Sequence, residues 1–88
     1  MAKVLVLIRV MPVDENVDLD GLADKISKGL PKGIELHESR REPLAFGAES
    51  LLMAFAMPDE EGHVYALEEY LKGFPEIQEF MTEFVTRV

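Results

Sequence analysis

Four segments of the chain carry the alternating or continuous apolar patterns that are typical of β-strands. We expect these strands at residues 3–11, 34–42, 50–57 and 77–88. The first and third segments are the richest in apolar residues, which predicts central positions in a sheet. The second carries many charges, which is typical of an edge strand. Strict alternation in this second strand would place Leu36 and Glu38 on one face and His37 on the other.

Two segments between these strands repeat apolar residues at the spacing of an amphipathic helix. The first helix is expected to begin after Asp18, whose carboxylate suits an N-cap, and to end at Gly29. The second is expected over about residues 63–72, with Gly73 as its stop. We expect the acidic residues 59–61 to mark the start of the second helix, where the helix dipole favours negative charge.

The resulting β-α-β-β-α-β order predicts an α+β protein with the ferredoxin-like fold. Right-handed crossovers would place the strands in the order 4-1-3-2 in one antiparallel sheet, with both helices on one face. A chain of 88 residues suits a single domain, residues 1–88, with one core. Met53, Met57 and Met81 lie within strand-like segments and are expected to help fill that core.

The charge balance limits the kinds of partner. The chain carries 17 acidic and 9 basic residues, a net charge of −8, and no cysteine. Because a nucleic-acid backbone rewards clustered Lys and Arg, we expect no direct nucleic-acid binding and instead a protein partner with a basic face. The longest apolar run, residues 51–57, is too short to cross a membrane. Together with the absence of cysteine, this favours a cytoplasmic protein.

No recognisable catalytic constellation occurs in the sequence. His37 and His63 are the only histidines, and neither has the spacing to carboxylates that a metal or catalytic site requires. The acidic residues 59–61 lack the alternating oxygen ligands of a calcium loop. The glycines are scattered at turns and form no phosphate-binding loop. We therefore expect no catalytic residue, no metal and no cofactor.

The loop between the second and third strands contains an unusual pair, Phe46 followed by Gly47. Tight loops normally use polar turn-forming residues. Two interpretations of Phe46 stay open at this point. Its ring folds back over the open end of the core, or it is an exposed anchor for a partner, since aromatic residues dominate interface hot spots. Pro43 ends the pairing of the edge strand, and Gly47 permits the turn into the third strand.

Phe46 and the C-terminal Arg87 belong to short motifs that are spread over the whole chain. The motifs are IRVMP (8–12), VDLDGL (17–22), EPLAFG (42–47), EEYLKGFPEI (68–77) and TRV (86–88). Together they resemble the translation elongation factor 1-beta family in its short archaeal form, and EPLAFG is the most specific of them. The resemblance implies a guanine nucleotide exchange factor. Such a protein accelerates GDP release from the elongation factor 1-alpha GTPase during translation and performs no covalent chemistry.

The resemblance also implies which residues contact the partner. In the family, an aromatic residue in the loop between strands two and three packs into the GTPase, and it falls on Phe46, beside Gly47. A penultimate lysine, which approaches the magnesium site of the GTPase, falls on Arg87, next to Val88. Eukaryotic members carry lysines directly after the glycine, whereas this chain has Ala-Glu-Ser at residues 48–50. Charge pairing at that point is therefore not implied for this chain.

The predicted topology places the two candidate contacts far apart. Strands two and three meet at one end of the sheet, whereas strand four finishes at the other end. For strands of about six residues, Phe46 and Arg87 would lie roughly 20 Å apart. A partner that touches both residues must therefore be large, as a multidomain GTPase is.

An ACT-like small-molecule-binding regulatory domain is the alternative, because such domains share the β-α-β-β-α-β order. They usually bind amino acids at helix-start loops between paired subunits. The first strand-to-helix loop, MPVDENVD at residues 11–18, is acidic and lacks a glycine-rich turn, which disfavours this alternative. A structural dimerisation module stays open as a third class. For the exchange factor we expect a monomer.

Overall fold

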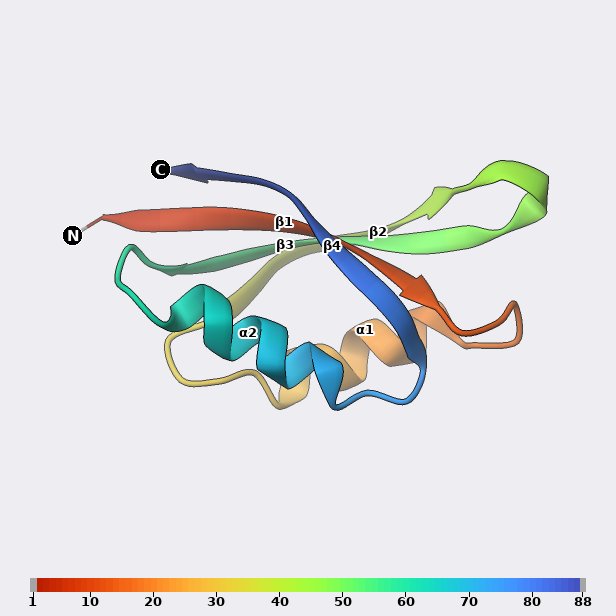
Figure 1. Cartoon of the computed structure of the whole chain (residues 1–88), viewed down its shortest axis with the longest axis horizontal. Helices are drawn as coiled ribbons and strands as arrows, with labels where there is room; N and C mark the ends of the chain where they lie inside the picture. Colours follow the sequence, from red (N-terminus) through yellow and green to blue (C-terminus); the bar gives the residue numbers. More distant parts are fainter. Residues whose placement is uncertain (1, 88) are drawn as a thin grey trace.

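The computed structural model describes residues 2–87, without the side chain of Ala45. Its elements follow the predicted order (Figure 1). They are β1 (Lys3–Pro12), α1 (Leu19–Lys28), β2 (Glu35–Pro43), a 3-10 turn (Ala45–Gly47), β3 (Glu49–Pro58), α2 (His63–Lys72) and β4 (Ile77–Arg87). The predicted bounds of the strands differ from these by at most one residue, and helix α2 has the bounds that its apolar stripe predicts.

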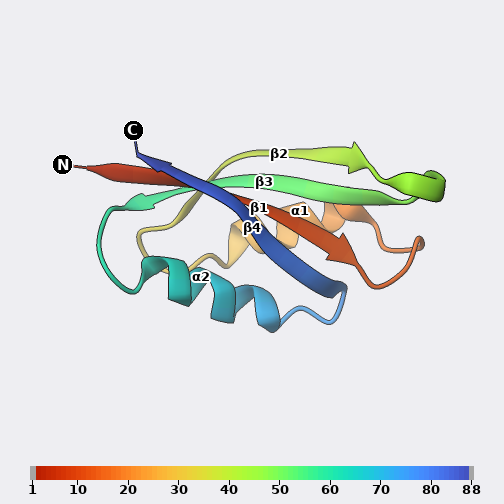
Figure 2. The same cartoon turned by 45° about the horizontal axis from the view of Figure 1, so that its top comes forward.

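The four strands form one sheet in the order β2-β3-β1-β4, which is the predicted order read from the other edge. Each neighbouring pair is antiparallel, so β3 and β4, which both flank β1, run in the same direction. Both helices lie on one face of the sheet, and the opposite face has no covering layer among residues 2–87 (Figures 1 and 2). The ferredoxin-like α+β prediction is therefore confirmed.

The hydrophobic core lies between the helices and the central strands. The alternate residues of β1 and β3 that face the helices are buried: Val4, Val6, Ile8, Val10, Leu51, Met53, Phe55 and Met57. The helices contribute Leu19, Leu22, Ile26, Leu67 and Leu71. Burial of this apolar surface is the main force that holds the helices on the sheet. Met53 and Met57 fill the core as predicted, whereas Met81 is exposed on the edge strand β4, and its prediction is wrong.

The edge strand β2 departs from strict alternation. A bulge lies between Leu36 and Glu38, so that Leu36 pairs with Phe55 and Glu38 pairs with the next residue back, Ala54. Because consecutive residues of β3 point to opposite faces, Leu36 and Glu38 do so as well. The prediction that they share a face is therefore wrong, since an extra residue, His37, shifts the register.

The acidic residues 59–61 lie in the turn before α2 rather than in its first helical turn. The helix begins at His63 and has no acidic residue in its first turn, and Gly62 occupies the N-cap with φ 93°. These acids therefore lead into α2, as predicted, and lie just before its first helical turn rather than within it. One of them, Asp59, instead lies against the end of β4, as described below.

Candidate functional site

Phe46 lies at the tip of the β2–β3 hairpin with its ring fully exposed. Of the two interpretations, the structure excludes a ring folded over the core. Its backbone has φ 62° and ψ 30°, and Phe46 is the only non-glycine residue of residues 2–87 with a positive φ. A bulky side chain in this left-handed region costs about 1–2 kcal/mol. The hairpin therefore holds an aromatic ring in water on a strained backbone, an arrangement that is typical of functional sites.

Gly47 continues the left-handed turn with φ 79°. A Cβ added at this position would meet no atom within 4 Å, so the glycine is required by the backbone angle and not by crowding. The turn is closed by the Leu44 N–H, which donates to the carbonyl oxygen of Ala48 at 2.6 Å. Directly before it, Pro43 pairs with Glu49 as the last residue of β2, as the sequence predicts.

A partly buried polar network supports the base of this hairpin. Ser50 is fully buried, and its Oγ accepts a hydrogen bond from Arg9 Nη1 at 3.0 Å and donates to the carbonyl oxygen of Glu42 at 3.3 Å. Arg9 Nη2 also contacts Glu83 Oε1 at 3.4 Å. These contacts join all four strands at one level of the sheet. Sequence reasoning missed the network because its members lie up to 74 positions apart.

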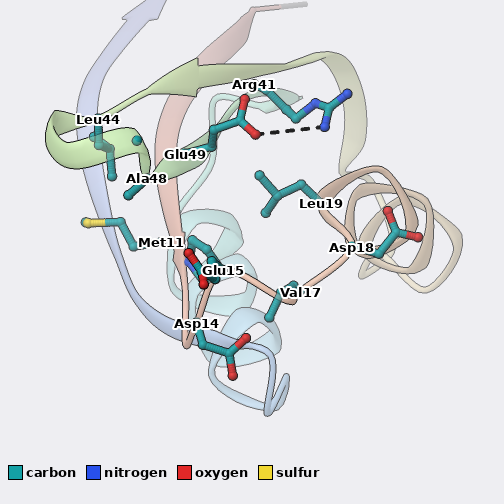
Figure 3. A pocket seen from close by; sticks show the side chains of 12 residues that line it. Met11, Asp14, Glu15, Val17, Asp18, Leu19, Arg41, Leu44, Ala48 and Glu49 are labelled. Carbon is teal, nitrogen blue, oxygen red and sulfur yellow. Dashed lines mark ion pairs between the residues drawn. The ribbon is translucent and has the colours of Figure 1, made fainter.

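A groove of about 390 Å³ opens between the β1–α1 connection and the hairpin (Figure 3). Its apolar lining includes Met11, Val17, Leu19, Leu44 and Ala48, and its acidic lining is Asp14, Glu15, Asp18 and Glu49. Arg41 crosses one rim, 3.9 Å from Glu49 and 3.5 Å from Asp20. Gly47 also lines the groove, so the groove and the Phe46 loop form one continuous surface at this end of the sheet.

Arg87 is the last residue of β4 in the described structure, where it pairs with Val4. Its side chain is largely exposed, and its Nε lies 2.9 Å from Oδ2 of Asp59, whose side chain is one-third exposed. The predicted partner-binding residue Val88 lies outside the described residues. The sequence identified Arg87 as a candidate but gave no indication that a carboxylate from the turn before α2 would lie beside it.

The structure separates Phe46 from Arg87, as the topology predicts. Val4 of β1 pairs with Arg87, whereas Val10 pairs with Leu51, five residues beyond the hairpin tip. The six residue steps of β1 from Val4 to Val10 span about 20 Å, and the hairpin extends further along the molecule, whose longest dimension is 42 Å. Figure 1 shows the chain end and the hairpin at opposite sides of the sheet. The two residues therefore do not form one pocket.

Neither residue belongs to a site that would suggest catalysis. No group of three or more His, Asp or Glu side chains among residues 2–87 is placed to hold a metal ion. His37 is exposed in the bulge of β2, and His63 is the half-buried first residue of α2. Within the same range, neither helix is long and apolar enough to cross a bilayer. The described residues thus hold candidate contact residues at two ends of the sheet and no cluster of reactive groups.

Comparison with known proteins gives a match over nearly the whole chain. Residues 5–88 match the family described as the EF-1 guanine nucleotide exchange domain. Elongation factor 1-beta of Staphylothermus marinus is 42% identical over 89 aligned positions, which cover 100% of this chain and 99% of that protein. The protein of the same name from Desulfurococcus amylolyticus is 38% identical at the same coverage. That of Halobacterium salinarum is 34% identical over the full length of both. The chain therefore belongs to the EF-1 guanine nucleotide exchange domain family.

Proposed function

We propose that this chain accelerates the release of GDP from the GTPase elongation factor 1-alpha, so that GTP can bind and the next elongation cycle can begin. The observation that carries the proposal is the fully exposed ring of Phe46, held at the hairpin tip on a strained backbone. The family match supports the reaction, and the names of the relatives support the elongation cycle as its setting. The choice of elongation factor 1-alpha as the partner is our inference.

Nucleotide exchange requires differential binding and no covalent step. An exchange factor binds the nucleotide-free GTPase more tightly than the GDP-bound form, and linkage then weakens GDP binding by the same factor. Phe46 would supply binding energy as an aromatic anchor, since such residues carry a large share of interface free energy. Because this anchor and Arg87 lie at opposite ends of the sheet, each would contact a different region of a large partner.

Arg87 would act on the nucleotide site through its charge. In P-loop GTPases a magnesium ion bridges the phosphates and the protein oxygens. A guanidinium brought close to that ion would repel it and compete for its oxygen ligands. Guanidinium is planar and carries five N–H donors, whereas the ammonium group of lysine is a compact point charge. We therefore expect Arg87 to act by binding the oxygens as well as by repelling the metal.

The other properties of the complex follow from the same surface. The net charge of −8 favours a basic protein surface over a phosphate backbone, so we expect contact with the GTPase and none with nucleic acid. Neither anchor requires a second copy of the chain, and we expect the monomer to be active. The family match also favours nucleotide exchange over the ACT-like alternative.

The test is the release of a fluorescent GDP analogue from purified elongation factor 1-alpha, with and without the chain. We expect Phe46→Ala, Arg87→Ala and removal of residues 87–88 each to slow release at least tenfold. Two exposed residues of the helical layer, outside both candidate contacts, serve as matched controls: Tyr65→Ala for an exposed aromatic ring on α2, and Lys28→Ala for an exposed, ion-paired cation on α1. Wild-type release rates for both Phe46→Ala and Arg87→Ala would overturn the proposal.

A further inference from the structure

Asp59 sits at the end of the sheet where β4 finishes, in the turn between β3 and α2. Its backbone N–H donates to the carbonyl oxygen of Ala2 at 3.1 Å, and the N–H of Glu60 donates to the carbonyl oxygen of Pro58 at 2.9 Å. These bonds fix the turn against the start of β1. The Asp59 carboxylate is thus held on a restrained backbone, with about two-thirds of its side chain buried.

Arg87 is placed very differently. It lies at the end of an edge strand, and its side chain is 78% exposed. The neighbour of β4 in the sheet is β1 alone. An arginine side chain in such a position carries about 2 kcal/mol of rotamer entropy, part of which a partner would have to remove on binding. The one ion pair of Arg87 among residues 2–87 is the 2.9 Å contact between its Nε and Oδ2 of Asp59.

We propose that Asp59 is a positioning residue, which orders the Arg87 guanidinium before the partner binds. The inference rests on the proposed function, because it needs Arg87 to act on the GTPase. A guanidinium has five N–H donors, and one carboxylate accepts at most two of them in a bidentate pair. Arg87 therefore keeps at least three donors for oxygens of the partner while Asp59 restrains it.

The same contact also has an opposing electrostatic effect. A carboxylate beside the guanidinium reduces the positive field that Arg87 presents at a distance. If only the strength of the positive field of Arg87 at the nucleotide site mattered, removing the charge of Asp59 would speed exchange. If positioning dominates, removing it slows exchange. Since water and salt screen the field of Arg87 at a distance, whereas the 2.9 Å contact with Asp59 acts at short range, we expect ordering to dominate. The two effects differ in sign, so one measurement separates them.

The experiment compares GDP release from elongation factor 1-alpha for Asp59→Asn, Asp59→Glu and the neighbouring charge control Glu60→Gln, each with Arg87 and with Arg87→Ala. We expect Asp59→Asn to slow release three- to tenfold, Asp59→Glu to recover most of the rate, and Glu60→Gln to leave it unchanged. In the Arg87→Ala background, Asp59→Asn should cause no further loss, because contacting residues that act as one unit are not additive.

A second readout follows Arg87 in the isolated chain. We expect the Arg87 Nε–Hε NMR signal to show restricted picosecond-to-nanosecond motion, and Asp59→Asn to release that restriction without changing the backbone spectrum elsewhere.

The inference is overturned if Asp59→Asn leaves the exchange rate unchanged, raises it, or lowers it equally without Arg87, or if the Nε–Hε motion does not respond. If Arg87→Ala slows exchange while Asp59→Asn does not, the proposed function stands and the role of Asp59 falls. Wild-type rates for Phe46→Ala and Arg87→Ala would instead remove the proposed function itself.

Discussion

The two ends of the sheet present their candidate contact residues by different physical means. At the hairpin end, backbone geometry holds Phe46: two successive residues have positive φ, and the ring lies in water. At the other end, Arg87 occupies an ordinary strand position, and a side-chain ion pair with Asp59 restrains it. The first contact is apolar and built into the fold, whereas the second is electrostatic and depends on one carboxylate.

This difference has consequences for how each end responds to its surroundings. Exposed ion pairs are screened by salt, with a Debye length of about 8 Å at physiological ionic strength. Burial of an aromatic ring in a partner is driven by the hydrophobic effect, which such screening leaves largely intact. We therefore regard the hairpin end as the source of affinity and the Arg87 end as the source of the effect on bound nucleotide. The following variants test this division, beginning with the largest expected effect.

Combining Phe46→Ala with Arg87→Ala should reduce the efficiency of exchange by the product of the two single effects. Loss of an aromatic hot spot costs about 2–3 kcal/mol, and loss of a charge-assisted contact costs about 1.5–3 kcal/mol. Residues separated by more than about 10 Å that share no contacting residues have additive effects. Titrating the GTPase with each protein in the GDP-release assay gives the exchange efficiency of the two single variants and of the double variant. A double variant no worse than the poorer single one would show that the two ends act as one unit.

Ser50→Ala should destabilise the hairpin end and leave the Arg87 end intact. The change removes the buried Oγ that joins Arg9 to the carbonyl of Glu42. An unsatisfied buried polar group costs about 1–3 kcal/mol. Urea unfolding measures this loss, and Ser27→Ala, which removes an exposed hydroxyl from α1, is the matched control. Equal stability of the two variants would mean that the network contributes nothing to holding the hairpin.

The fold could be predicted because its main determinants are local. Alternating apolar residues in β1 and β3, apolar spacing in the two helices and glycines at the helix ends each specify one element, and their order restricts the topology. The bulge at His37 could not be predicted in this way, because no local pattern distinguishes an extra residue from a continuing strand. Met81 is exposed because it pairs with Arg9 on the face of the sheet opposite the helices, and this depends on the pairing register of β4.

The candidate site was predictable only in part. The sequence identified Phe46 and Arg87, and the strand order alone placed them at opposite ends of the sheet. Whether the Phe46 ring is buried or exposed depends on its φ angle, which composition does not determine. The Asp59–Arg87 pair depends on how a turn and a chain end meet in three dimensions. Contacts of this kind, between residues far apart in sequence and on the surface, leave no periodic pattern.

Phe46→Gly should separate stability from function at the hairpin end. Glycine adopts positive φ without the steric cost that a side chain suffers, so relief at φ 62° should raise the free energy of unfolding by up to about 1 kcal/mol. For a domain of this size that corresponds to a rise in Tm of roughly 4–8 °C. Phe46→Ala keeps a Cβ in the left-handed region and should leave Tm nearly unchanged, which makes it the matched control.

Both variants at Phe46 should lose exchange activity to the same extent, since both lack the ring. A more stable but less active Phe46→Gly protein would show that the strain at this position serves the presentation of the ring to a partner. A fall in Tm for Phe46→Gly would instead mean that the ring stabilises the hairpin. In that case the exposed ring would have a structural role, and the contrast with the ion-paired Arg87 end would no longer hold.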